Sequence, residues 1–336
     1  MRLAVEMSLH LDAKGQQIPE QIERMQEVRL CTFWGAFSLN QAWSLTLEQL
    51  PQLSQLTKLT MKPIIIDALE SSSWIPYTDD SKHTQLLCLS PLTNTGALLE
   101  KNYTQPSNIR SVCTAYSELS EIIHKSSYLY DSIPAALRLG QNFTPCVLFC
   151  YMYYHYAVLL LFRPFIKLTL IGSAILPRNV CDEAADAIPA LVKSYSQLYT
   201  LRQTPSFIPY FIFTTSITHL IVSSNTSIEP EKFLQGISDL TEMNNCHGFA
   251  SHTRNILLYL VKKWKIPLPK DGALIAETDL NTWGCPNIEI VDMMKGIGTV
   301  SEDKDLLFWL FPIQEQPLLA YRQNELRKNG FALLQE

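Results

Sequence analysis

Apolar residues recur at intervals of three and four along much of the chain, which is the spacing of one helix face. One helix is predicted to begin near Pro19, with Ile22, Met25, Phe33 and Phe37 sharing a face. Further helices are predicted at about 107–124, 144–162, 179–201, 206–222, 230–244 and 251–264. The pattern therefore predicts an all-α fold, a large helical bundle or solenoid-like domain.

The strongest predicted helix covers residues 144–162. Thr144 suits its N-cap, Pro145 suits its first position, and Arg163-Pro164 ends it. No charged residue lies between Arg138 and Arg163, which is long enough for a membrane span. However, His155 and several tyrosines lie in the middle of the run, where lipid disfavours them. We therefore predict a buried core helix and no membrane contact.

The helical periodicity fades after Lys265, where prolines and glycines interrupt the chain. The sequence is accordingly divided into a helical domain at 1–265, N-terminally incomplete, and an irregular region at 266–336. Residues 71–80 are predicted to be a polar loop, helical periodicity resumes near Thr84, and a short polar helix-like tail closes the chain. Within 301–312, acidic residues precede an apolar cluster, which is either an activation-type motif or a terminal helix docked on the core. The cluster comprises Leu306, Phe308, Trp309 and Phe311.

Composition supports a folded helical protein and excludes several classes. Hydrophobic residues make up 47% and charged residues 18%, and only 12 of the 336 residues are glycine. The net charge of −5 gives no support for direct contact with DNA. The eight cysteines form no CxxC pair and are predicted to be buried free thiols, so no zinc site is expected here. No signal peptide and no catalytic motif is found, and the chain is predicted not to be an enzyme.

Four segments, taken in order, resemble the middle homology region of fungal zinc binuclear cluster transcription factors, in particular nitrate- and xylanolytic-regulator-like members. They are residues 2–12, 27–45, 74–80 and 154–165. The sequence departs from the family pattern at Ser8, at Asn40 and in the turn at 48–51. The matching residues are Leu9, His10, Arg29, Phe33, Trp34, Gly35, Trp74, Pro76, Tyr77, Tyr154, His155, Arg163, Pro164 and Phe165.

The resemblance implies the regulatory part of a nuclear transcription factor that controls RNA polymerase II transcription of metabolic or biosynthetic genes. DNA would then be bound only through the family's zinc cluster, whose six cysteines are absent from this sequence, and zinc is expected only in that module. A coactivator or a second copy is the expected protein partner. The chain is expected to be a fragment, a truncated gene product or a naturally short form.

From the residues alone, the matching positions are interpreted as packing signatures. Phe33 and Trp34 offer large apolar surfaces, and His155 is interpreted as a core histidine because no second ligand stands at helical spacing around it. Two other hypotheses stay open. One is a helical small-molecule-binding protein or enzyme with an apolar cavity lined by residues 146–162, and the other is a shortened paralogue that titrates partners.

Overall fold

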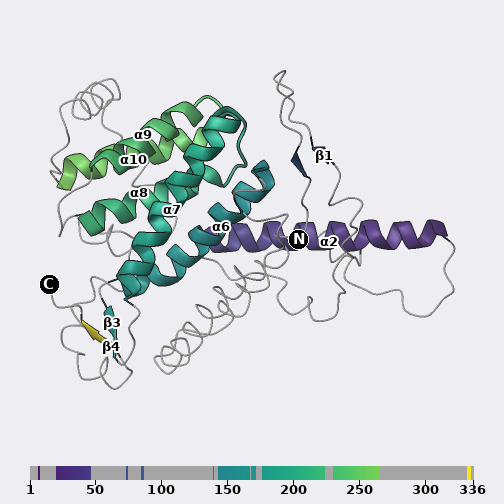
Figure 1. Cartoon of the computed structure of the whole chain (residues 1–336), viewed down its shortest axis with the longest axis horizontal. Helices are drawn as coiled ribbons and strands as arrows, with labels where there is room; N and C mark the ends of the chain where they lie inside the picture. Colours follow the sequence, from purple (N-terminus) through teal and green to yellow (C-terminus); the bar gives the residue numbers. More distant parts are fainter. Residues whose placement is uncertain are drawn as a thin grey trace. The chain divides into compact units, whose positions relative to one another are not determined.

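The computed structural model describes residues 20–46, 73–74, 85–86, 143–166, 168–171, 176–223, 230–264 and 331–333, together with Met7 and Leu139 (Figure 1). Contacts within the chain divide it into two units, 1–150 and 151–336. The division of the sequence into a helical domain at 1–265 and an irregular region at 266–336 stays a prediction.

Helices dominate the described part of the chain, which confirms the all-α prediction. The predicted helices that fall in this part are confirmed, with ends within about three residues of those expected. The helices are α2 (Glu20–Thr46), α6 (Pro145–Phe162), α7 (Pro177–Leu198), α8 (Ile208–Ser223), α9 (Pro230–Met243) and α10 (Gly248–Trp264), with the 3-10 turns η3 (Arg163–Phe165) and η4 (Leu201–Gln203). The predicted helices near 84 and at 107–124 lie outside the described residues, apart from Gln85 and Leu86.

Short strands appear where the sequence predicted none. Strand β1 (Ser73–Trp74) pairs with β2 (Gln85–Leu86) antiparallel, so the predicted polar loop and the helical start near Thr84 are wrong at these positions. Strand β3 (Leu168–Leu170) pairs antiparallel with β4 (Phe331–Leu333), in place of the end of a helix-like tail. Pairings of two or three residues are too short to produce a period-two pattern in the sequence.

The buried face of α2 is built from aromatic rings. Phe33 and Trp34 meet edge to face with ring centroids 5.7 Å apart, and Trp34 meets Phe37 in the same way at 5.3 Å. The prediction that Met25 shares this face is wrong, because Met25 is 66% exposed. Eight residues separate it from Phe33, and at about 100° per residue this turns its side chain roughly 80° away.

Helix α6 begins and ends as predicted. The backbone N–H of Val147 donates to Oγ of Thr144 at 3.4 Å, so Thr144 is the N-cap and Pro145 follows at the first helical position. The α-helix ends at Phe162, and Arg163 opens the 3-10 turn η3. Pro164 disfavours the α-helical conformation of the residue before it, Arg163, and this accounts for the change.

Within the described residues, α6 is the helix long and apolar enough to cross a membrane by length and composition. Buried core helices of soluble proteins share this composition, and 61% of α6 is buried. Two of its mid-helix tyrosines, Tyr153 and Tyr156, are buried and contact Phe211 of α8, with ring centroids 6.3 and 4.6 Å away. These contacts fit the predicted core helix.

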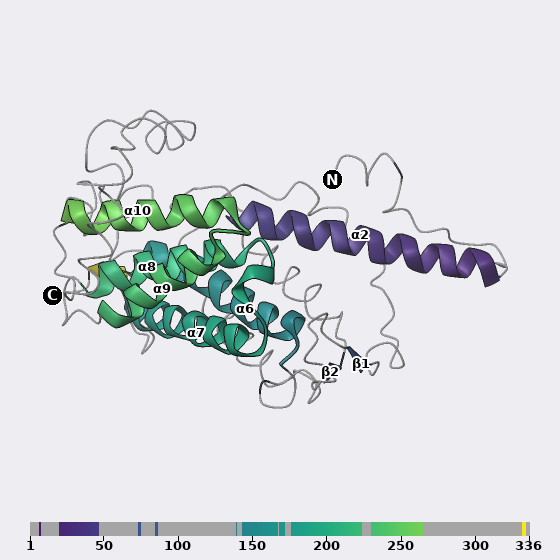
Figure 2. The same cartoon turned by 90° about the horizontal axis from the view of Figure 1, so that it is seen from above.

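Helix α8 is the central helix of the second unit. It contacts α7, α9 and α10, and Figure 2 shows α8 and α9 lying between α7 and α10. Between Ile208 and Ser223 the sequence has no charged residue other than the titratable His219, so α8 can be enclosed without burying a carboxylate or a lysine. Tyr210 stacks on Phe249 at the start of α10, with ring centroids 3.8 Å apart.

Gly236 of α9 permits the close approach of α8. A Cβ at this position would lie 2.3 Å from Oγ of Ser216, and Ile212 and the Ser216 Cβ would lie at 3.5 and 3.6 Å. Gly236 therefore has a packing function that offsets its low helix propensity. Gly35 of α2 differs, because a Cβ there would meet nothing within 4 Å.

Replacing Gly236 by alanine is expected to lower the free energy of unfolding by about 1–3 kcal/mol, since the new methyl overlaps the Ser216 hydroxyl. The double substitution G236A/S216A removes the overlap and should recover most of the loss. The control Gly35→Ala, in open space on α2, should stabilise by about 0.5–1 kcal/mol. Denaturant unfolding of the four chains measures these effects, and equal losses in G236A and G236A/S216A would contradict the packing explanation.

Candidate functional site

The family-like residues of α6 and η3 lead to a buried corner. Arg163 is only 8% exposed, and its charge acts on the Cys181 thiol of α7. Burial raises the pKa of Cys181, the neighbouring Asp182 raises it further, and Arg163 partly opposes both. Cys181 is therefore a protonated, unreactive thiol that contributes to packing.

His155 lies on α6 beside Tyr154, with ring centroids 5.1 Å apart. Burial lowers the pKa of His155 to about 4, so the imidazole is neutral at neutral pH. Because this folded-state pKa lies below the ordinary value of 6.5, the unfolded chain binds the proton more readily. His155 therefore lowers the stability of the fold as the pH falls from about 6.5 through 4.

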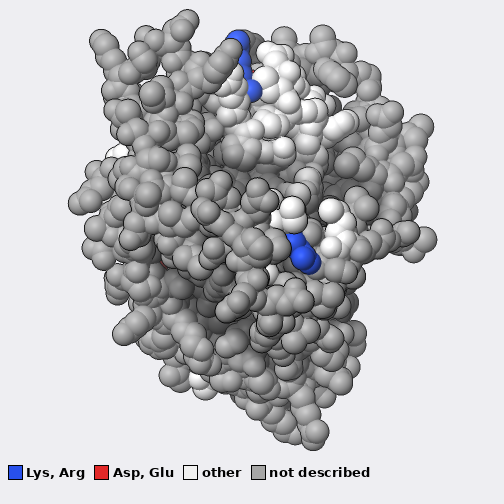
Figure 3. Space-filling model, turned by 90° about the vertical axis from the view of Figure 1, so that its right-hand side faces the viewer, with Lys and Arg blue, Asp and Glu red and all other residues white. Residues whose placement is uncertain are grey.

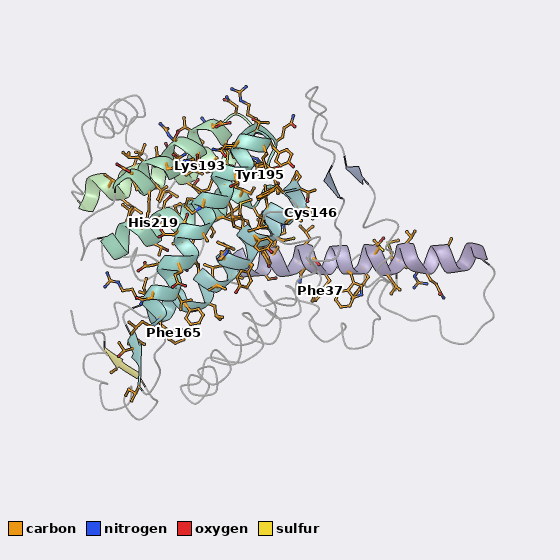
Figure 4. The ribbon with its side chains drawn as sticks, viewed as in Figure 1. Phe37, Cys146, Phe165, Lys193, Tyr195 and His219 are labelled. Atoms are coloured by element: carbon orange, nitrogen blue, oxygen red, sulfur yellow. The ribbon has the colours of Figure 1, made fainter. Side chains whose placement is uncertain are left out.

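A polar junction joins α7, α8 and α9 in the second unit. Lys232 of α9 contacts both carboxylate oxygens of Asp186 on α7, each at 3.0 Å. His219 of α8, labelled in Figure 4, places Nε2 3.7 Å from the nearer Asp186 oxygen. The Lys232–Asp186 pair is partly exposed, so its net contribution to stability is small, about 0–1 kcal/mol. The junction is notable for its geometry, because α7, α8 and α9 each contribute one side chain to it.

Asp239 of α9 is the most strongly desolvated carboxylate with a resolved shift in the described residues. It is 7% exposed, and Nε2 of Gln235 donates to its Oδ1 at 2.7 Å. Burial raises its pKa to about 6; the Gln235 hydrogen bond lowers it, and Glu242 raises it slightly. The carboxylate is thus ionised at neutral pH, and this buried charge lowers the stability of the fold. The loss of stability is absent below pH 3.8, the ordinary pKa of the group, because the carboxyl is then neutral in both the folded and the unfolded chain.

A second polar contact fixes the turn between α7 and α8. The Tyr195 hydroxyl of α7 donates to the Gln203 carbonyl of η4 at 3.0 Å, and Thr204 meets Nε2 of His247 at 2.9 Å. Burial raises the pKa of Tyr195 to about 12, so its hydroxyl stays protonated and available as a donor. The turn is thereby tied both to α7 and to the residue preceding α10.

The structure places the residues that sequence analysis singled out as follows. Phe33 and Trp34 are buried on α2, Gly35 on the same helix is exposed, and Arg29 is partly exposed. Tyr154, His155, Arg163 and Phe165 follow one another through α6 and η3. The side chains of Trp74 and Pro164 are not described by the structure. The remaining positions lie outside the described residues: Leu9, His10, Pro76, Tyr77, Leu306, Phe308, Trp309 and Phe311.

The prediction of buried cysteines holds for Cys150 and Cys181, whereas Cys146 is partly exposed and Cys31 and Cys246 are exposed. Cys88, Cys113 and Cys285 lie outside the described residues. Among the described residues no group of three or more His, Cys, Asp or Glu side chains is placed to hold a metal ion. The junction residues Asp186, His219 and Lys232 could not be recognised in the sequence, because the residues of each pair stand at least 13 positions apart and no local spacing joins them.

On the side seen in Figure 3, the described residues form only scattered parts of the surface. White atoms, neither acidic nor basic, predominate among the described atoms there, and Lys or Arg atoms appear only at isolated places. Duplex DNA requires a continuous basic stripe or patch.

The fold and site define the described part of the chain as an all-α protein whose polar groups connect helices at their contacts. The chain is similar to the nitrogen assimilation transcription factor nit-4 of Neurospora crassa, with 27% identity over 84% of this chain and 27% of the relative. It is also similar to the nitrogen assimilation transcription factor nirA of Emericella nidulans, with 25% identity over 84% of this chain and 33% of the relative.

These relatives confirm the resemblance to fungal transcription factors that the four motifs predicted. The chain spans about a third or less of the length of either relative. No protein-family profile matches the chain, and no solved structure matches it.

Replacing Asp239 by asparagine is expected to stabilise the fold at pH 7.5 by up to roughly 3 kcal/mol, because the desolvated charge is removed while Gln235 keeps an acceptor. The gain should shrink as the pH falls from about 6 to 4, where the wild-type carboxyl becomes neutral. Thermal and denaturant unfolding across this range measure it. The control Glu183→Gln removes an exposed carboxylate of α7 and should change stability by less than about 0.5 kcal/mol. A gain that is the same at pH 4 and pH 7.5 would refute the desolvation argument.

Proposed function

We propose that this chain is a regulatory region of a fungal transcription factor of the nitrogen-assimilation type. In this function it controls RNA polymerase II transcription of metabolic genes in the nucleus. The observation that carries the proposal is the similarity to two nitrogen assimilation transcription factors over 84% of the chain. The proposal assigns the chain no catalytic activity.

The structure supports a regulatory task for these residues more than direct DNA binding. The net charge of −5 and the absence of any CxxC pair both differ from what a DNA-binding module requires. In the proposed protein, DNA is bound by a zinc cluster module outside these 336 residues. The helical body then changes the output of that module in response to a ligand or a protein partner.

A fusion experiment tests the regulatory function. The 336-residue chain is inserted between a heterologous DNA-binding domain and a strong activation domain, and reporter output is measured in a fungal host on nitrate and on ammonium. We expect reporter output to depend on the nitrogen source, and the same fusion without the chain to be indifferent to it. An expressed, helical insert whose reporter ignores the nitrogen source would overturn the proposal.

Residues 301–312 are proposed to carry a separate activation function, in which acidic residues keep an aromatic cluster solvated until a coactivator groove binds it. Residues 295–320 fused to a heterologous DNA-binding domain should therefore activate a reporter. Replacing Trp309 and Phe311 by alanine should abolish the activity, whereas Gln314→Ala in the same segment should preserve it. A silent wild-type segment would favour the alternative of a terminal helix docked on the core.

The other two hypotheses predict different observations. A small-molecule-binding protein would carry a stoichiometric apolar ligand after purification, and an enzyme would show turnover. A partner-titrating form would co-purify with a full-length relative and would lower reporter output only when that relative is present.

A further inference from the structure

Helix α7 contains a proline in its interior. Pro189 lies thirteenth in the helix Pro177–Leu198, and it has no N–H to donate to the carbonyl of Ala185 four residues earlier. Its ring also crowds that carbonyl, which turns the oxygen away from the helix axis. The Ala185 carbonyl therefore lacks the backbone donor that the helix would normally supply, at a position where the Ala185 side chain is fully buried.

A side chain from another helix supplies the missing donor. Nε2 of His219 on α8 lies 3.2 Å from the Ala185 carbonyl oxygen, and His219 is 9% exposed. A carbonyl oxygen only accepts hydrogen bonds, so Nε2 of the ring carries the hydrogen. The histidine thus replaces across the helix contact the bond that Pro189 removed within α7.

The donor is held in place by the polar junction. Asp186, next to Ala185, lies 3.7 Å from Nε2 of His219, and Lys232 of α9 holds the Asp186 carboxylate from the other side at 3.0 Å. Side chains from α8 and α9 therefore converge on the turn of α7 that the proline weakens. Figure 4 shows His219 on α8, a helix that contacts both α7 and α9.

The weakened turn separates two ends of α7 with different attachments. Toward the N-terminal end, Cys181 lies within the electrostatic reach of Arg163 in the turn η3, which belongs to the family-like segment 154–165. Toward the C-terminal end, Tyr195 is bonded to Gln203 of η4. Any bend at Pro189 would move these two attachments relative to one another.

We propose that Pro189 and His219 form a latched hinge, in which the histidine closes the break in α7 and its release lets the helix bend. This inference rests on the proposed regulatory function, because it names the element through which the η3 corner and the α8–α10 body influence each other. A regulatory domain requires such an element with two discrete arrangements.

A double-substitution cycle on the full chain tests the latch. His219→Phe fills the same space without a donor and should lower the folding equilibrium constant roughly 10-fold to 100-fold, the loss expected for a buried acceptor left without its donor. Pro189→Ala restores a backbone N–H that can reach the Ala185 carbonyl. In this background H219F should cost less than about 5-fold. Equal costs in the two backgrounds would overturn the proposal.

A conservative variant separates the hydrogen bond from simple packing. His219→Gln can place an amide N–H near the position of Nε2, so it should retain most of the folding equilibrium constant that H219F loses. Amide exchange in residues 182–193 should rise on the order of tenfold in H219F and stay near the wild-type rate in H219Q. A glutamine variant as damaged as the phenylalanine variant would contradict a donor function.

Two further readouts distinguish the latch from the proposed function. Nitrogen chemical shifts of labelled His219 should show hydrogen on Nε2 in the wild-type chain and in P189A, and the opposite tautomer would overturn the latch without reference to transcription. In the reporter fusion, H219F should change the response to nitrogen source and H219Q should not. A latch confirmed by the cycle but without effect on a responsive reporter would remove its regulatory part alone.

Discussion

Burial of α8 on several sides is the constraint on which the second unit depends. A helix in this position must satisfy its polar groups inside the protein, because water cannot reach them. Two of its hydroxyls do so within the helix: Thr215 donates to the Ile212 carbonyl and Thr218 to the Thr214 carbonyl, both at 2.9 Å. His219 differs from these two threonines because it bonds to another helix, and it thereby forms a polar connection between α8 and α7.

Two desolvated groups give the fold opposite responses to acid. The neutral imidazole of His155, with a pKa near 4, favours unfolding as the pH falls below about 6.5. Asp239, with a pKa near 6, favours folding over much of the same interval, because its ionised form is costly in the folded chain. The two effects partly cancel, so a flat pH dependence of stability in the wild-type chain is compatible with both shifts. Single substitutions are needed to reveal either one.

The sequence predicted the helices well because their limits depend on local chemistry. Thr144, Pro145 and Pro164 act through their own backbone geometry and side chains, so the ends of α6 could be located without any tertiary contact. Met25 was misplaced because a face inferred from spacing drifts over eight residues. The polar junction could not be predicted, since it joins residues from three helices whose packing the sequence does not state. Pro189 was the available signal: a proline inside a predicted helix implies a carbonyl that needs a donor from elsewhere.

Three residues at or beside the helix contacts of the second unit each lower the stability of the helix that carries them. Pro189 removes a backbone hydrogen bond from α7, Gly236 has poor helix propensity in α9, and Asp239 keeps a desolvated charge on α9. Helices α7 and α9 both contact α8, so these departures from local stability gather around one central helix. A sequence selected only for a rigid helical body would avoid Pro189 and Asp239, since alanine and asparagine are simple replacements. Local choices that conflict with stability are expected where a protein must change shape or bind, and this places the moving part of the proposed regulator at the contacts of α8.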